Sequence, residues 1–220
     1  MRTKTRILLL CTLFPIFLSA QTVHLFNCKG LDNWYAFDAA TGNRLSALEL
    51  FSVEKKCLRL YGKKAGYLMS KQSFANFKLS AQFKWNTDSS FSKSSKTKNS
   101  GIMYLVPDTA KDALWPAGIQ FQIKSGSTGD FILLCGVTCE IDGKTTTAGK
   151  SVIYSKTADA EKKMGKWNSI EIIVKDNIVT QKLNGKVVNK ANNPSVNRGR
   201  TLLQYEGYPI DFRKIKMEEF

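Results

Sequence analysis

The sequence predicts an all-β fold, a β-sandwich of jelly-roll type made of two antiparallel sheets. Three observations support this prediction. Apolar and polar residues alternate with the period of two that a strand imposes, most regularly over residues 77–85. About a dozen such segments follow one another at spacings of roughly 8–12 residues, and no long segment has a helical period. The 13 Phe, 7 Tyr and 4 Trp residues are enough to fill a core between two sheets.

Residues 1–20 are predicted to be a secretory signal peptide. A basic segment at residues 2–6, an apolar core at 7–18 and a small-residue cleavage site at 18–20 follow in the order that such peptides have. The apolar core is too short to span a bilayer. We therefore expect an exported protein, periplasmic or at the cell surface, with no membrane insertion after cleavage and a single β-sandwich domain over residues 21–220.

Each element is predicted from local alternation and from the turn residues around it. Residues 39–50 are expected to form a turn or a short helix, and the Ser- and Lys-rich segment 86–98 a loop. Asp142-Gly143 and Asn184-Gly185 are typical of tight hairpin turns. The strands are expected at residues 25–27, 58–61, 66–70, 77–85, 102–106, 119–124, 131–135, 137–142, 152–154, 167–174, 178–183, 186–189, 201–205 and 210–217.

The chain is basic, with 33 Lys and Arg against 18 Asp and Glu and a net charge of +15. Loss of the three basic residues in the signal segment leaves +12. A basic balance can indicate a nucleic-acid partner. The lysines are scattered, however, and an exported protein does not ordinarily meet DNA, so we expect a solvated basic surface and no nucleic-acid partner.

Four cysteines remain after cleavage, at positions 28, 57, 135 and 139. In an oxidising compartment they allow two disulfides in three connectivities, and Cys135 and Cys139 are close enough in sequence to pair across a bend. Unpaired thiols remain open for all four. A zinc site is less favoured, because the spacing is unsuitable and the only histidine, His24, is remote.

Polar residues occupy one face of three predicted strands. Long neutral amides beside an indole suit sugar hydroxyls better than a phosphate, and Trp115 directly precedes the first of these strands. If the strands are neighbours, their polar side chains gather on a concave sheet face, where small ligands are normally held. The three sets are Gln120, Gln122 and Lys124; Arg200, Gln204 and Glu206; and Asp211 with Arg213.

Several enzyme classes are disfavoured by the residue content. One histidine makes a Ser-His-Asp or Cys-His device improbable, and the chain has neither a Gly-rich phosphate loop nor a metalloprotease helix motif. An ordinary glycosidase needs two carboxylates at the scissile bond. Glu206, Asp130 and Asp211 are possible members, but the sequence specifies no pair, and Asp130 is equally suited to capping a turn.

Eight phrases, in order, resemble one family of exported bacterial proteins, the 3-keto-disaccharide hydrolase domain. They are LFNCKGLDNWYAFD, AGYLMSKQSFANFKLSAQFKW, NSGIMYLV, WPAGIQFQIKSGSTGDF, KWNSIEIIVKDN, KLNGKVVN, GRTLLQYEG and IDFRKIKM. The resemblance runs from about Val23 to Phe220. It implies a concanavalin-like β-sandwich and cleavage of glycosides that carry a ketone at sugar C3.

The resemblance leads to a hypothesis for each candidate residue. Glu206 serves as the base or acid, Lys124 or Arg213 steadies a developing enolate, and the remaining candidates hold the sugar. Many relatives carry Glu at the position of Gln120, and we interpret the amide as a trait of a subgroup. The sugar-binding candidates are Trp115, Gln120, Gln122, Asp130 and Gln204.

Two other functions remain open. A non-catalytic carbohydrate-binding module would use the same amides and indole, and a raised carboxyl pKa in the pocket would favour the enzyme over the module. A structural sandwich domain would have the two glutamines covered by a loop or a partner. The hypothesis requires no cofactor, although a structural calcium is possible in such folds. The expected partner is a carbohydrate, and the sequence does not specify an oligomeric state.

Overall fold

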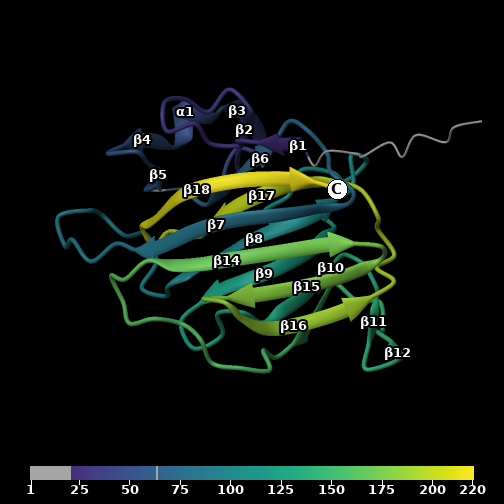
Figure 1. Cartoon of the computed structure of the whole chain (residues 1–220). Coiled ribbons are helices and arrows are strands. Elements are labelled where there is room, and N and C mark those ends of the chain that lie inside the picture. Colours follow the sequence, from purple (N-terminus) through teal and green to yellow (C-terminus); the bar gives the residue numbers. More distant parts are fainter. Residues whose placement is uncertain (1–20, 63) are drawn as a thin grey trace, which may run out of the picture.

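Two antiparallel sheets stack face to face and contain most of the regular structure, as the all-β jelly-roll prediction requires (Figure 1). The computed structural model of the protein describes residues 21–62 and 64–220. The predicted signal peptide, residues 1–20, lies outside the described residues. One short helix, α1 (Ala47–Leu50), is present in the described part, and no described helix is long and apolar enough to cross a membrane.

The first layer is a ten-stranded sheet, with strand order β12-β11-β16-β15-β14-β7-β18-β5-β4 and with β1 paired to β18. In chain order its strands are β1 (Gln21–Val23), β4 (Ser52–Glu54), β5 (Cys57–Leu60), β7 (Phe77–Trp85), β11 (Glu140–Ile141), β12 (Lys144–Thr145), β14 (Asn168–Lys175), β15 (Ile178–Leu183), β16 (Lys186–Asn192) and β18 (Ile210–Glu219).

The second layer is an eight-stranded sheet, with strand order β13-β10-β9-β8-β17-β6-β2-β3. In chain order its strands are β2 (Trp34–Asp38), β3 (Asn43–Ser46), β6 (Gly66–Ser70), β8 (Asn99–Val106), β9 (Gly118–Lys124), β10 (Phe131–Leu134), β13 (Ser151–Tyr154) and β17 (Arg200–Tyr205).

The main hydrophobic core lies between the two sheets. In β7 every second side chain is buried, and Phe77, Leu79 and Phe83 pack against residues of the opposite sheet. Phe121 and Ile123 on β9 enter the same core, so Gln120, Gln122 and Lys124 must point to the outer face of the eight-stranded sheet. The alternation therefore sets the direction of the candidate site.

A second, smaller apolar cluster covers part of that outer face. Tyr67, Met103 and Leu202 belong to it, and they share their strand faces with polar side chains of the candidate site. The segment 107–117, between β8 and β9, packs over this cluster through Ala110. Strands β8 and β9 are therefore buried on both faces, which a simple alternating pattern does not predict.

Most predicted strands are confirmed, several with the same bounds, and three departures have local causes. Residues 25–27 are irregular, because Leu25 and Phe26 fill the core without pairing into the sheet, apart from the bond from the Phe26 N–H to the Ile215 carbonyl (3.2 Å). Residues 137–142 form a strand only at 140–141. The segment 39–50 contains the predicted short helix but also strand β3.

Candidate functional site

A cavity of about 720 Å³ opens on the outer face of the eight-stranded sheet. It brings together four predicted site residues that come from three separate parts of the chain: Trp115, Gln120, Gln122 and Glu206. The remaining lining residues are Asn99, Ala113, Leu114, Ile132, Leu134, Cys135, Lys150 and Ser151. The predicted convergence of the glutamines with Glu206 is therefore confirmed.

A continuous row of hydrogen bonds links the polar residues of this cavity. The Gln120 amide donates to the Gln122 side-chain carbonyl, and Gln122 Nε2 donates to Asn99 Oδ1 at 2.9 Å. Asn99 Nδ2 in turn donates to Glu206 Oε2 at 2.7 Å. The Gln120 Oε1 atom is buried and has no hydrogen-bond partner among the described residues, so the row contains one unsatisfied acceptor.

A glycine makes room for this row. Gly101 on β8 pairs with Gln122 on β9, and a Cβ atom at position 101 would lie 2.6 Å from the Gln120 amide nitrogen. Any larger residue would therefore push the Gln120 side chain out of its place. Two residues of the Asn-Ser-Gly phrase thus serve the cavity: Asn99 supplies an amide to the row, and Gly101 leaves space for the Gln120 side chain.

Glu206 lies directly after β17 and is the carboxylate of the cavity. Burial raises its pKa above the ordinary value of 4.5, while donors on Trp115 and Asn99 and the charge of Lys124 partly offset the effect of burial. A carboxyl group with a raised pKa, held by fixed donors at the end of a cavity, can accept a proton from a bound molecule near neutral pH. Lys124 supplies a positive charge at the same end.

Trp115 is carried by the 107–117 segment, which is anchored to the sheet beneath it. Asp112 accepts hydrogen bonds from Tyr67 Oη at 2.6 Å and Tyr35 Oη at 3.3 Å, and it forms an ion pair with Arg44. The Trp115 ring, with 47% of its residue surface exposed, is free to contact a ligand. Sequence reasoning missed Asp112, because it acts through the segment rather than in the cavity.

Four predicted site residues do not line the cavity: Lys124, whose charge still acts on Glu206, and Gln204, Asp130 and Arg213. Gln204 is fully buried beneath the 107–117 segment, where its Nε2 donates to the Leu114 carbonyl at 3.3 Å. The Asp130 carboxylate accepts the Lys156 backbone N–H at 3.0 Å, so it links the turn before β10 to the segment after β13. Neither residue lines the cavity.

The expectation that Arg213 lies beside Glu206 is wrong. Arg213 belongs to β18 in the ten-stranded sheet, where its Nε donates to Gln82 Oε1 at 2.8 Å and its guanidinium lies 3.9 Å from the Trp167 ring centre. Alternation assigns a side chain to a face of its own strand, but it does not say to which sheet the strand belongs. Lys124 is therefore the cation that accompanies Glu206.

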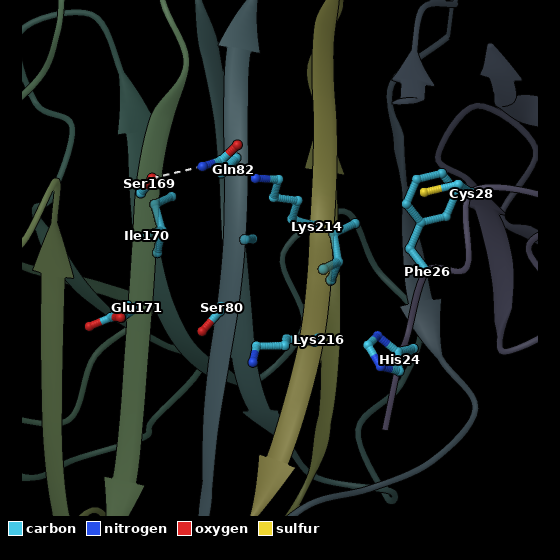
Figure 2. Close-up of a pocket in the computed structure, with 12 residues that line it drawn as sticks. His24, Phe26, Cys28, Ser80, Gln82, Ser169, Ile170, Glu171, Lys214 and Lys216 are labelled. Atoms are coloured by element: carbon cyan, nitrogen blue, oxygen red, sulfur yellow. Dashed lines mark hydrogen bonds between the residues drawn. The ribbon is translucent and has the colours of Figure 1, made fainter. Parts of the chain in front are cut away.

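A second cavity, of about 490 Å³, lies on the outer side of the ten-stranded sheet (Figure 2). Ser80 and Gln82 on β7, Ser169 on β14 and the bulged part of β18 line it, together with His24 (Figure 2). Gln82 Nε2 donates to Ser169 Oγ at 3.1 Å while its carbonyl accepts from the neighbouring arginine. The central amide of this cavity is thus already satisfied within the protein, unlike Gln120.

The four cysteines of the described part are free thiols, so the disulfide considered between Cys135 and Cys139 is not formed. Cys139 is buried in the core, and burial raises its pKa to about 11. Cys135 lies at the cavity edge, where its Sγ contacts the Trp115 carbonyl at 3.5 Å. Within residues 21–62 and 64–220, no cluster of three His, Cys, Asp or Glu residues could hold a metal ion.

The two stacked antiparallel sheets define the fold class of the protein, a jelly-roll β-sandwich with a cavity on the outer face of one sheet. Residues 21–218 match the model of the 3-keto-alpha-glucoside-1,2-lyase-like domain. The chain belongs to that family, as the resemblance of its eight phrases implied. No curated protein sequence matches the chain significantly.

Solved structures agree with this assignment of the fold. Two candidate glycosyl hydrolases of Parabacteroides distasonis ATCC 8503 align with TM-scores of 0.62 and 0.60 at 18% and 22% identity. The alignments cover 90% and 91% of this chain and 94% and 100% of theirs. The carbohydrate-binding module CBM66 of Bacillus subtilis aligns at TM-score 0.55 and 11% identity, covering 85% of this chain and 96% of its own.

Proposed function

We propose that the protein is an exported enzyme that cleaves 3-keto-glycosides by elimination followed by hydration. A ketone at C3 acidifies the proton at C2, so a single base can remove it. The C1–O bond then breaks, the leaving alcohol takes up a proton, and an enone remains. Water adds across the C1=C2 bond, and the net reaction is hydrolysis to a free 3-keto sugar and an alcohol.

The residues of the cavity have the chemistry that this route needs. Glu206 accepts the C2 proton, and Asn99 and Trp115 fix the position of its carboxylate. The Lys124 ammonium stabilises the enolate that develops at the C3 oxygen. Gln120 and Gln122, which line the cavity, bind sugar hydroxyls through their amides.

The single observation that carries the proposal is the raised pKa of Glu206 at the end of a cavity of substrate size. Sugar binding alone does not require a carboxyl group with a raised pKa, whereas proton abstraction near neutral pH is helped by one. Among the described residues, Glu206 is the only carboxylate that lines the cavity.

The test is turnover of 3-keto-glucosides of both anomers, followed by release of the alcohol. A Glu206→Gln variant should lose at least about 10²-fold in kcat, the scale of a positioned base. Asp211→Asn is the matched control, because burial also raises the pKa of Asp211, which lies on the other sheet. Undiminished activity of Glu206→Gln would remove this residue from the mechanism.

The exposed Trp115 ring also suits a carbohydrate-binding module without catalysis. The same experiment separates the two functions. A module would bind the glucosides but release no alcohol, and Glu206→Gln would change only its affinity. A substrate with deuterium at sugar C2 also separates the two functions. If the enzyme removes the C2 proton, the deuterium should exchange with solvent or the substrate should react more slowly than its undeuterated form.

A further inference from the structure

The cavity has two chemically different ends. Asn99 pairs with Lys124 at the carboxyl end of β9, and Glu206 is beside them. Gly118 at the amino end of β9 pairs with Leu134 on β10. A strand of this length spans about 20 Å, which exceeds the length of one sugar ring. A substrate whose sugar is held at Glu206 therefore places its leaving group toward the far end.

The floor of the far end is apolar. Ile132 and Leu134 on β10 are 8% and 5% exposed and face the cavity, and Leu114 and Ala113 of the 107–117 segment line it above them. These side chains offer no hydrogen bond to a second sugar, whose hydroxyls would lose their water on entry. The polar residues of this end, Lys150 and Ser151, are exposed and lie at the rim.

The apolar surface continues beyond the cavity onto an edge strand. Ile132 pairs with Ile153 on β13, and paired residues of antiparallel strands point to the same face. The Ile153 side chain is therefore next to that of Ile132, and Ile153 is 60% exposed. An exposed β-branched side chain beside a cavity floor provides contact area for an apolar group that extends out of the cavity.

We propose that this end is a leaving-group subsite for an apolar aglycone, an aryl or alicyclic alcohol, in preference to a second sugar. The inference rests on the proposed function for the position of the scissile bond. Ile132 and Leu134 on β10 and Ile153 on β13 form the subsite, and the polar row, which runs from Glu206 to Gln120 beside Ile132, selects the 3-keto sugar. Specificity thus comes from the polar side chains of β8 and β9 and from the apolar side chains of the neighbouring strands β10 and β13.

The test compares two 3-keto-glucosides that both have a primary alcohol as leaving group, with a ring of similar size. One carries cyclohexylmethanol and the other carries glucose linked through O6. We expect kcat/KM to be about tenfold higher for the cyclohexylmethyl glycoside. Equal or higher kcat/KM for the disaccharide would overturn the subsite and leave the proposed function standing.

Two variants test which residues cause the preference for the cyclohexylmethyl glycoside. Ile153→Ser alters an exposed side chain and should reduce the ratio of the two kcat/KM values by about threefold, and Ile132→Asn should abolish the preference. Ile178→Ser is the matched control, since Ile178 is 39% exposed on the ten-stranded sheet. A preference that persists in both subsite variants would contradict the assignment.

A binding measurement keeps the inference testable even if the proposed function fails. Calorimetry with the unoxidised cyclohexylmethyl and methyl glucosides needs no turnover. We expect the cyclohexylmethyl compound to bind about tenfold more tightly to the wild type and Ile153→Ser to weaken only that compound. Equal affinities of the two glucosides would exclude an apolar subsite, whatever the catalytic result.

Discussion

Glu206 holds its carboxylate in a position that favours the neutral form. Burial removes water from the charged group, and the donors on Trp115 and Asn99 replace only part of that solvation. Because its folded-state pKa lies above the unfolded value, the group stabilises the protein at pH values below 4.5 relative to higher pH. This advantage is lost as the pH rises through the folded pKa.

The pH dependence of the contribution of Glu206 to stability can be measured. Glu206→Gln keeps the hydrogen-bond acceptor for Asn99 and removes the buried charge, so the variant should have a higher Tm than the wild type at pH 7. The gain should shrink as the pH falls and disappear below about pH 4.5. Thermal unfolding of both proteins between pH 4 and 8 checks it. A lower Tm for the variant at pH 7 would mean that the carboxylate is favourably solvated.

The sequence predicts the Glu206 end of the cavity only in part, for reasons that particular residues make clear. The sequence indicates Gln120, Gln122 and Glu206, because alternation assigns each side chain to one face of its strand and the family phrases contain all three residues. Asn99 begins strand β8, and the sequence does not single it out as a site residue, although it shares a face with Gly101 and donates to Glu206. Its role depends on the pairing of β8 with β9 and β17, which local alternation does not contain.

At the scale of elements, the 107–117 segment decides how much of the eight-stranded sheet is open. Arg200 anchors the start of the segment, with its Nε 3.3 Å from Asp108 Oδ1, and Asp112 anchors its middle. Burial raises the pKa of Asp112, but bonds from Arg44 and Tyr67 outweigh burial and leave it below 3.8. The anchor is therefore charged at neutral pH and weakens as the pH falls through the folded pKa.

Removing this anchor should loosen the segment and displace Trp115. Asp112→Ala leaves the Tyr67 hydroxyl and Arg44 without their acceptor, and we expect a loss of about 1–3 kcal/mol in the free energy of unfolding. KM should rise more than kcat falls, and Trp115 fluorescence should shift to the red. The KM of Asp112→Asn should lie between those of Asp112→Ala and the wild type. Asp159→Ala, at an 89%-exposed carboxylate, is the control and should change neither property.

Strands are predictable from the sequence where one face is buried and the other is exposed to solvent. Strand β7 is the clearest case, since its buried and partly exposed positions alternate without exception. Strand β3 escaped prediction because it is a short edge strand that is mostly exposed, so it lacks an alternating apolar set. The sequence also does not predict that the 107–117 segment covers the outer face of the eight-stranded sheet. This segment has no periodic pattern and is held by isolated polar contacts.

At the scale of the whole molecule, one polar contact joins the two layers inside the core. Gln181 on β15 of the ten-stranded sheet donates from Nε2 to Tyr104 Oη on β8 of the eight-stranded sheet at 2.9 Å. Both residues are fully buried, and burial raises the pKa of Tyr104 well above 10, so the phenol is neutral. Gln181 Oε1 has no partner among the described residues, so the pair is only partly satisfied.

The pair predicts a non-additive mutational cycle. Tyr104→Phe should cost about 1–3 kcal/mol in the free energy of unfolding, because it leaves the Gln181 amide buried with no partner. Gln181→Leu alone should be milder, since it also removes the unpartnered Oε1 atom and the Tyr104 hydroxyl is left as the single orphan. In the double variant both polar groups are gone, so it should be more stable than Tyr104→Phe. Urea unfolding measures all four proteins, and strictly additive losses would mean that the two layers are not coupled through this bond.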